Sequence, residues 1–318
     1  MRRKSPRRKT FNLALRSPLL PRLEETPCSR RRENPGAWGN RKRKVHHYIS
    51  SKSSVHNVWT HFPKDPNCPV CNECKRNRAQ CRSKIHGKPD ELPEPTKFAH
   101  SITADHKIIN EDDSSRDNDR VAMIIQDRFT KWLQGYASKT KSHQECVKFF
   151  QRFFGPQMKP EHVYTDNSKE LEKALDELGW VHDTSTPHRP QTNGVAERAV
   201  RIVKEGTSCT LVQSGFDDIW WPQAMNCFCF LRNVVDLLES EETAYKKRFG
   251  CDFTGPLIPF GAEINYKPIS SKDEARLHQF GSKVLSGIFV GYDQQAGGGW
   301  SGRPLSSRLG PSRECRAF

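Results

Sequence analysis

The sequence predicts an α/β protein whose central domain is a mixed β-sheet with flanking helices. Three β-like runs, at 98–105, 120–127 and 132–137, follow one another through short polar connections that are typical of antiparallel strands. From residue 142 onwards, helical and β-like segments alternate. Strands that come first and alternating elements that come later indicate one mixed sheet with helices on both of its faces.

The alternating part begins with a helix that Ser142 can cap. Glu145 follows three residues later, as in a capping box, and Val147, Phe150 and Phe154 lie along one side of this helix. The next predicted elements are a strand at 162–166, a helix at 168–178 and a short strand at 180–181. They bring the predicted sheet to five strands.

Three carboxylates are placed by these elements. Asp105 and Asp166 each end a β-like run, and Glu197 lies in the first turn of a helix that starts after Asn193-Gly194. Glu197 is off the buried stripe of that helix, which has i, i+4, i+8 spacing and consists of Val195, Ala199 and Val203. Acidic side chains at two strand ends and on one helix form the oxygen-rich cage that binds Mg²⁺ for phosphoryl transfer. We call Asp105, Asp166 and Glu197 the acidic triad.

The residues around the acidic triad resemble a known family. Thr-Asp-Asn at 165–167, Pro-Gln-Thr-Asn-Gly-Val-Ala-Glu at 190–197 and Thr-Ala-Asp at 103–105 are similar to the catalytic core of retroviral and retrotransposon integrases. That family uses Asp, Asp and Glu on a ribonuclease-H-like fold. The stretches 256–261 and 287–292 resemble the region after the core in copia-type retrotransposon polyproteins. The resemblance extends over roughly residues 56–300.

The chain departs from the family pattern at two points. Between Asp166 and Glu197 lie 30 residues (167–196), fewer than in the retroviral pattern, which predicts a trimmed helix and loop. Ser168 stands where the family usually places a glycine. Asp127 also ends a β-like run and is a rival for the second catalytic position. We assign it a structural role because Asp166 has the family's local sequence and lies nearer Glu197.

The resemblance implies an integrase that uses two Mg²⁺ or Mn²⁺ ions. Asp105 would bridge both ions, and Asp166 and Glu197 would each hold one. Water would first trim a terminus of the element's DNA, and the freed 3′-hydroxyl would then attack the target DNA. The implied partners are the element ends, the target DNA and further copies of the chain, and the implied location is the nucleus. No small-molecule cofactor is expected.

A second group of metal-binding side chains precedes the core. His56, His61, Cys68 and Cys71 have the spacing His-x4-His-x6-Cys-x2-Cys, and we call them the His/Cys cluster. Two thiolates from a Cys-x2-Cys loop and two imidazoles complete a closed tetrahedral shell, so one structural Zn²⁺ is predicted. The cluster resembles the His-His-Cys-Cys zinc domain that precedes integrase cores. The competing ligands are Cys74 and Cys81.

Basic residues are concentrated before the core. Residues 1–90 hold 23 Lys and Arg against 6 Asp and Glu, a net charge of +17, whereas the whole chain has a net charge of +15. Such a block is the electrostatic footprint of a nucleic-acid partner, and it is compatible with a nuclear address. The predicted DNA contacts are Lys75, Arg76 and Arg78 beside the His/Cys cluster, and Arg198, Arg201 and Lys204 on the helix of Glu197.

Composition and linker patterns divide the chain into six predicted segments. At 318 residues it has room for two or three domains, and its mean hydropathy of −0.81 indicates that not all of it is packed core. The segments are a disordered basic tail (1–50), a zinc-binding module (51–86), a linker (87–96), the catalytic core with its following helices (97–254), a small β-rich module (255–295) and a disordered tail (296–318). Within the fourth segment, residues 243–250 are predicted as a basic turn.

Two cellular contexts are excluded by the sequence pattern. The longest apolar runs fall far short of the roughly 20 residues that cross a bilayer, so no membrane partner is expected. The first residues lead into more charge rather than into an apolar signal core. Eleven cysteines, an odd count without a secretory signal, are therefore interpreted as thiols or metal ligands rather than disulfides.

Two other classes of function remain open at this point. One is a zinc-containing DNA-binding remnant that has lost catalysis, against which the intact acidic triad argues. The other is a ribonuclease-H-like nuclease that cuts DNA without joining it. Only the joining reaction separates this nuclease from an integrase.

Overall fold

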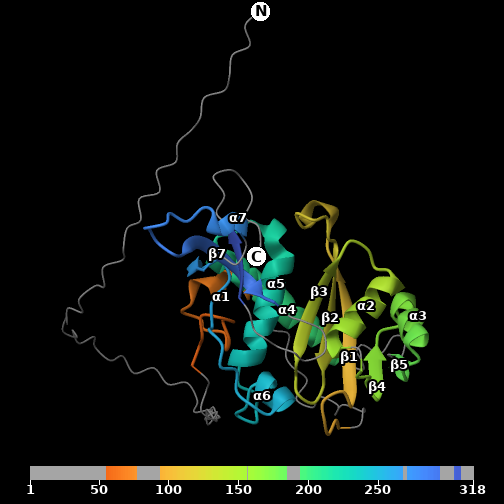
Figure 1. Cartoon of the computed structure of the whole chain (residues 1–318). Helices are drawn as coiled ribbons and strands as arrows, with labels where there is room; N and C mark the ends of the chain where they lie inside the picture. Colours follow the sequence, from red (N-terminus) through yellow and green to blue (C-terminus); the bar gives the residue numbers. More distant parts are fainter. Residues whose placement is uncertain are drawn as a thin grey trace, which may run out of the picture. The chain divides into compact units, whose positions relative to one another are not determined.

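The computed structural model describes residues 55–76, 94–155, 157–184, 194–267, 271–293 and 304–308 (Figure 1). The basic tail predicted for 1–50 and most of the linker predicted for 87–96 lie outside these residues. So does the first half of the Pro190–Glu197 motif, of which the described part begins at Gly194.

A mixed five-stranded sheet forms the centre of the fold, in the order β3-β2-β1-β4-β5. Its strands are β1 (Ser101–Ile108), β2 (Val121–Asp127), β3 (Leu133–Ser138), β4 (His162–Thr165) and β5 (His182–Thr184). The first three are antiparallel neighbours, whereas β4 pairs parallel with β1 and β5 pairs parallel with β4. The predicted fold class is confirmed, although β5 lies two residues later than predicted.

Helices cover both faces of this sheet (Figure 1). Ile102, Met123 and Ile125 belong to one core with residues of α2 (His143–Phe154) and α3 (Lys169–Leu178). Ala122, Ile124 and Leu133 belong to a second core with residues of α4 (Gly194–Ser214) and α5 (Trp221–Val235). Alternate residues of β2 therefore point to opposite faces, as the period of two in a strand requires. The second core attaches α4, the helix that carries Glu197, to the sheet.

The helix starts follow from local capping signals. Ser142 Oγ accepts a hydrogen bond from Glu145 N at 3.4 Å at the start of α2, as the sequence predicts. The predicted basic turn at 243–250 is instead a short helix, α6 (Ala244–Phe249). Thr243 Oγ1 caps it by accepting from Lys246 N at 3.1 Å, and Gly250 ends it at a φ of 74°.

Helices α4 and α5 approach each other closely at Gly206. A Cβ atom on Gly206 would lie 2.0 Å from Phe228 Cζ, and Phe228 is itself buried in the second core. We therefore expect Gly206→Ala to lower the free energy of unfolding by about 2–3 kcal/mol, because overpacking outweighs the better helix propensity of alanine. Urea unfolding measures this. Gly194→Ala, where an added Cβ meets nothing within 4 Å, is the control, and equal stability of both variants would contradict the account.

A small β-rich module packs against α5. Its three strands, in the order β6-β7-β8, are β6 (Glu263–Tyr266), β7 (Leu285–Tyr292) and β8 (Pro304–Arg308), and a short helix, α7 (Ser271–Glu274), lies between the first two. The rings of Tyr292 and Phe230 lie 4.1 Å apart between centroids. β8 falls inside the predicted disordered tail 296–318, so that prediction is wrong for this strand.

The segment that precedes the catalytic core in the sequence packs on the side of the sheet that α4 and α5 cover. Its one described helix, α1 (Pro69–Cys74), contacts α4. Among the described residues, no helix is both long and apolar enough to cross a membrane.

Candidate functional site

The sheet brings the two aspartates of the acidic triad to neighbouring positions. Ala104 in β1 is the parallel partner of Thr165, the last residue of β4. Asp105 follows Ala104 and Asp166 follows Thr165, so the two carboxylates leave adjacent strands at the same level. The sequence predicts both aspartates at strand ends, which is correct for Asp166 but wrong for Asp105, because β1 continues to Ile108. The sequence does not predict the pairing of β1 with β4, which is a long-range contact.

Glu197 joins them from α4, where its side chain is exposed in the first turn. The pKa of Asp105 shows that the charges of Asp166 and Glu197 act on it. Burial raises the pKa of Asp105 to about 6, and the negative charges of Asp166 and Glu197 contribute to the rise, whereas the ammonium of Lys141 opposes them. The triad therefore forms one electrostatic unit in which the ionised form of Asp105 is disfavoured.

Oxygen atoms at this site fit a divalent cation. Asp166 Oδ1 is buried and has no hydrogen-bond partner, although buried carboxylate oxygens are normally paired. Asp105 Oδ1 accepts from His106 N at 2.7 Å. A hard cation such as Mg²⁺ supplies both the partner that Asp166 lacks and the positive charge that Asp105 lacks. Among the described residues, the group whose ligand atoms converge tightly is the His/Cys cluster. The carboxylates of the acidic triad are further apart than the ligands of that group.

Lys141 and Ser168 lie beside the triad, and only Ser168 is singled out by the sequence pattern. Lys141 lies near the acidic groups, with its Nζ 3.5 Å from Glu170 Oε2. Ser168 Oγ donates to the same Glu170 oxygen at 2.8 Å. Ser168 has a φ of −80°, which any residue adopts, so this position does not need the glycine that the family usually has there.

Asp127 lies in a different environment from the triad. It pairs with Ile102 at the far end of β1 from Asp105 and is fully buried. Its Oδ1 accepts from Ala99 N at 2.9 Å, and its Oδ2 accepts from Thr130 N and Thr130 Oγ1, both at 2.7 Å. These bonds occupy the carboxylate and tie the start of β1 to the turn after β2. The geometry supports the structural role predicted for Asp127.

The four residues of the His/Cys cluster meet in space. Their ligand atoms all lie within 4.8 Å of one another, close enough to converge on one tetrahedral ion. His61 Nδ1 is 3.5 Å from Cys68 Sγ. Burial lowers the pKa of His61 and raises that of the Cys71 thiol. The neutral imidazole that results is the form that binds a metal.

The competing ligands behave differently. Cys74 is in side-chain contact with Cys209 of α4 and is not part of the cluster. Cys81 lies outside the described residues.

The predicted DNA contacts divide into two groups. Arg198, Arg201 and Lys204 are exposed on α4, at and after the level of Glu197, and Arg76 is exposed beside α1. Lys75 is not free, because its Nζ donates to the carbonyl oxygen of His61 at 2.8 Å. Arg78 lies outside the described residues.

Comparison with known proteins gives two kinds of match, and no protein-family model matches the chain. The chain is 30% identical over 239 residues to the retrovirus-related Pol polyprotein from transposon RE1 of Arabidopsis thaliana, a match that covers 70% of this chain and 15% of that protein. It is 29% identical over 187 residues to the polyprotein from transposon RE2 of the same plant, a match that covers 57% and 12%. The chain thus spans about one seventh of the length of these relatives.

The solved structures that resemble the chain are retroviral integrases. The HTLV-2 integrase catalytic core domain in complex with magnesium, in a trimeric form, is 18% identical, covers 50% of this chain and 99% of that chain, and has a TM-score of 0.38. The simian T-cell lymphotropic virus intasome in complex with a PP2A regulatory subunit is 16% identical, covers 79% and 84%, and has a TM-score of 0.42. The predicted resemblance to retrotransposon polyproteins is confirmed by the two plant relatives, and the five-stranded sheet has the mixed order of strands that the predicted fold requires.

Proposed function

We propose that this chain is a retrotransposon integrase that trims the 3′ ends of the element's DNA and joins them to target DNA. The observation that carries the proposal is the electrostatic coupling of Asp105 in the middle of β1, Asp166 after the end of β4 and Glu197 in α4, with the pKa of Asp105 raised to about 6 by burial and by the other two charges. Carboxylates that disfavour one another's ionisation are suited to holding cations.

Asp105, Asp166 and Glu197 would be the ligands of two Mg²⁺ or Mn²⁺ ions. When bound, these ions neutralise the charge that develops on the attacked phosphate and activate the attacking oxygen. Water is the first nucleophile and the freed 3′-hydroxyl is the second, so no side chain needs to form a covalent intermediate. Arg198, Arg201 and Lys204 bind DNA phosphates on the exposed side of α4 and hold the strand in register with the triad.

The His/Cys cluster would hold one Zn²⁺ with a structural role. A segment this short has too few apolar residues to fold on its own core, and metal binding supplies the missing free energy. Assembly of several copies and a nuclear location belong to the same proposal, because the family resemblance implies both.

A DNA-joining assay on the wild-type protein separates this function from its two alternatives. The protein is folded with Zn²⁺ and incubated with Mg²⁺ or Mn²⁺ and a labelled duplex that carries the element's terminal sequence. Joined products are the expected result. Cleavage without joining would identify a nuclease, and binding without either reaction would identify a DNA-binding remnant.

A further inference from the structure

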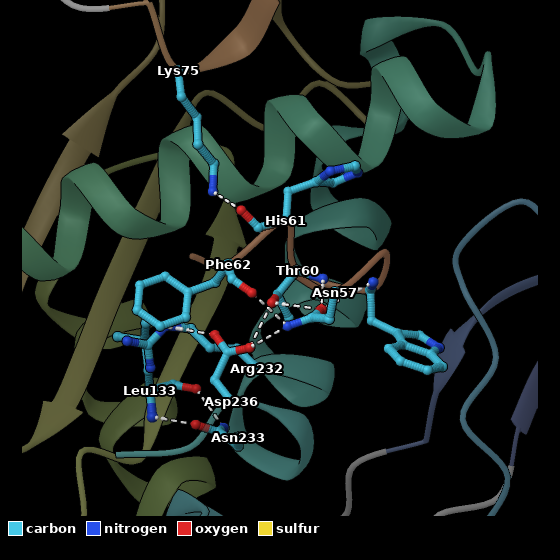
Figure 2. A network of polar contacts seen from close by, with 10 residues as sticks. Asn57, Thr60, His61, Phe62, Lys75, Leu133, Arg232, Asn233 and Asp236 are labelled. Atoms are coloured by element: carbon cyan, nitrogen blue, oxygen red, sulfur yellow. Dashed lines mark hydrogen bonds and ion pairs between the residues drawn. The ribbon is translucent and has the colours of Figure 1, made fainter. Parts of the chain in front are cut away.

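The loop that carries the two histidines is bound to the C-terminal end of α5 through Asp236 (Figure 2). Asp236 follows the last residue of α5 and is 5% exposed. Its Oδ1 accepts from Thr60 Oγ1 at 2.5 Å and from Asn57 Nδ2 at 3.2 Å, and its Oδ2 is 4.0 Å from Arg232 Nε. A buried carboxylate is costly unless donors surround it. The core therefore depends on this loop for both hydrogen-bond donors to Asp236 Oδ1.

The loop is also held in shape from within. Asn57 Oδ1 accepts from Thr60 N at 2.8 Å and from Trp59 N at 3.1 Å, so Asn57 both closes the turn and reaches Asp236. The residue after Thr60, His61, has a φ of 54°, which side chains other than glycine rarely adopt. Its carbonyl oxygen is fixed by Lys75 Nζ (Figure 2). The strained backbone of His61 persists because both of its flanks are anchored.

The imidazole of His61 connects the His/Cys cluster to α4. Its Nδ1 faces Cys68 Sγ at 3.5 Å, and its Nε2 lies 3.1 Å from Gln213 Oε1 in the last turn of α4. Oε1 is an acceptor only, so Nε2 must carry the proton and Nδ1 is left with a lone pair directed at the cluster. In metal sites, the partner of the second ring nitrogen fixes the orientation and the tautomer of the ligand.

We propose that Gln213 and the Thr60–Asp236 contact couple metal binding at the His/Cys cluster to helices α4 and α5 of the catalytic core. This inference rests on the metal assignment made above. Gln213 acts as a positioning residue for His61, and Asp236 holds the loop that presents His61 to the ion. Because coupling is reciprocal, metal binding tightens the contact between the loop and the core to the same extent that the contact tightens metal binding.

The test is the affinity for Zn²⁺, measured by competition with a chromophoric chelator on the full chain. Gln213→Leu removes the acceptor at an exposed position, where substitutions usually change stability by less than about 0.5 kcal/mol. It is expected to weaken Zn²⁺ binding by about 10–100-fold. Gln213→Glu keeps an oxygen acceptor and is expected to restore wild-type affinity. Gln151→Leu, at an exposed glutamine of α2, is the matched control and is expected to bind Zn²⁺ as the wild type does.

A second pair of variants tests the Asp236 contact. Thr60→Val deletes the hydroxyl at nearly constant shape and is expected to weaken Zn²⁺ binding by about 10-fold. Thr210→Val deletes a buried hydroxyl that bonds only within α4, to Gly206 O at 2.9 Å, and is expected to change nothing. If the wild type binds Zn²⁺ and Gln213→Leu and Thr60→Val bind it equally well, the coupling is refuted and the metal assignment stands. If the wild type binds no Zn²⁺, the metal assignment itself fails, and the coupling fails with it.

Discussion

Asp105→Asn is expected to abolish DNA joining and, at the same time, to stabilise the metal-free protein. The rate of joining should fall by about 10³-fold or more, because the substitution removes a carboxylate that would hold the catalytic metal ions. The gain in stability follows from the pKa of Asp105, which is about 6 in the folded protein and near 3.8 when unperturbed. At neutral pH the fold must keep this carboxylate ionised beside two others. Removing the charge is expected to raise the free energy of unfolding by about 1–3 kcal/mol.

The pH dependence of stability shows whether the gain in Asp105→Asn comes from the raised pKa of Asp105 or from a change in packing. Since the folded pKa is raised, the folded state binds more protons than the unfolded state between pH 3.8 and about 6. The contribution of Asp105 to stability therefore falls as pH rises through this window, and its cost persists above it. Urea unfolding in chelator from about pH 4 to about pH 8 should give a gap between variant and wild type that grows up to about pH 6. Asp112→Asn, at an exposed acidic turn, is the control, and a destabilised Asp105→Asn would contradict the account.

Asp127→Ala should have the opposite effect and lower the free energy of unfolding by about 3–5 kcal/mol. The substitution leaves three buried donors, Ala99 N, Thr130 N and Thr130 Oγ1, without their acceptor. Each orphaned donor costs about 1–3 kcal/mol. Urea unfolding measures the loss, and joining by the fraction that remains folded should be unchanged. A variant that folds normally but cannot join DNA would instead make Asp127 the second catalytic aspartate.

The parts of the fold that the sequence predicts are those set by neighbouring residues. The cap at Ser142, the burial of Ala199 and Val203 in α4 and the strand that ends before Asp166 all arise from signals within a few residues. The third residue of the predicted stripe, Val195, is only partly buried. The helix at 244–249 was missed because its cap, Thr243, and its terminator, Gly250, surround only six residues, five of them polar or aromatic. Short helices carry too little periodicity to be told from turns.

The candidate site was predicted in its residue types but not in its connections. The acidic triad and the His/Cys cluster are visible as motifs, because each needs particular side chains at particular spacings. Asp236 and Gln213 carry no such signal, since their partners Thr60 and His61 lie 176 and 152 residues away. Lys75 was predicted as a DNA contact because it is basic, and only the fold reveals that His61 O binds its ammonium group.

The most direct test of the central claim compares two glutamates on one helix. Glu197 lies in the first turn of α4, and Glu205 lies on the same helix about 12 Å further along its axis. The account predicts that Glu197→Gln joins no DNA in Mg²⁺ while it still folds and binds Zn²⁺, and that Glu205→Gln joins DNA as the wild type does. Joining by Glu197→Gln at the wild-type rate would show that the acidic triad is not the catalytic site.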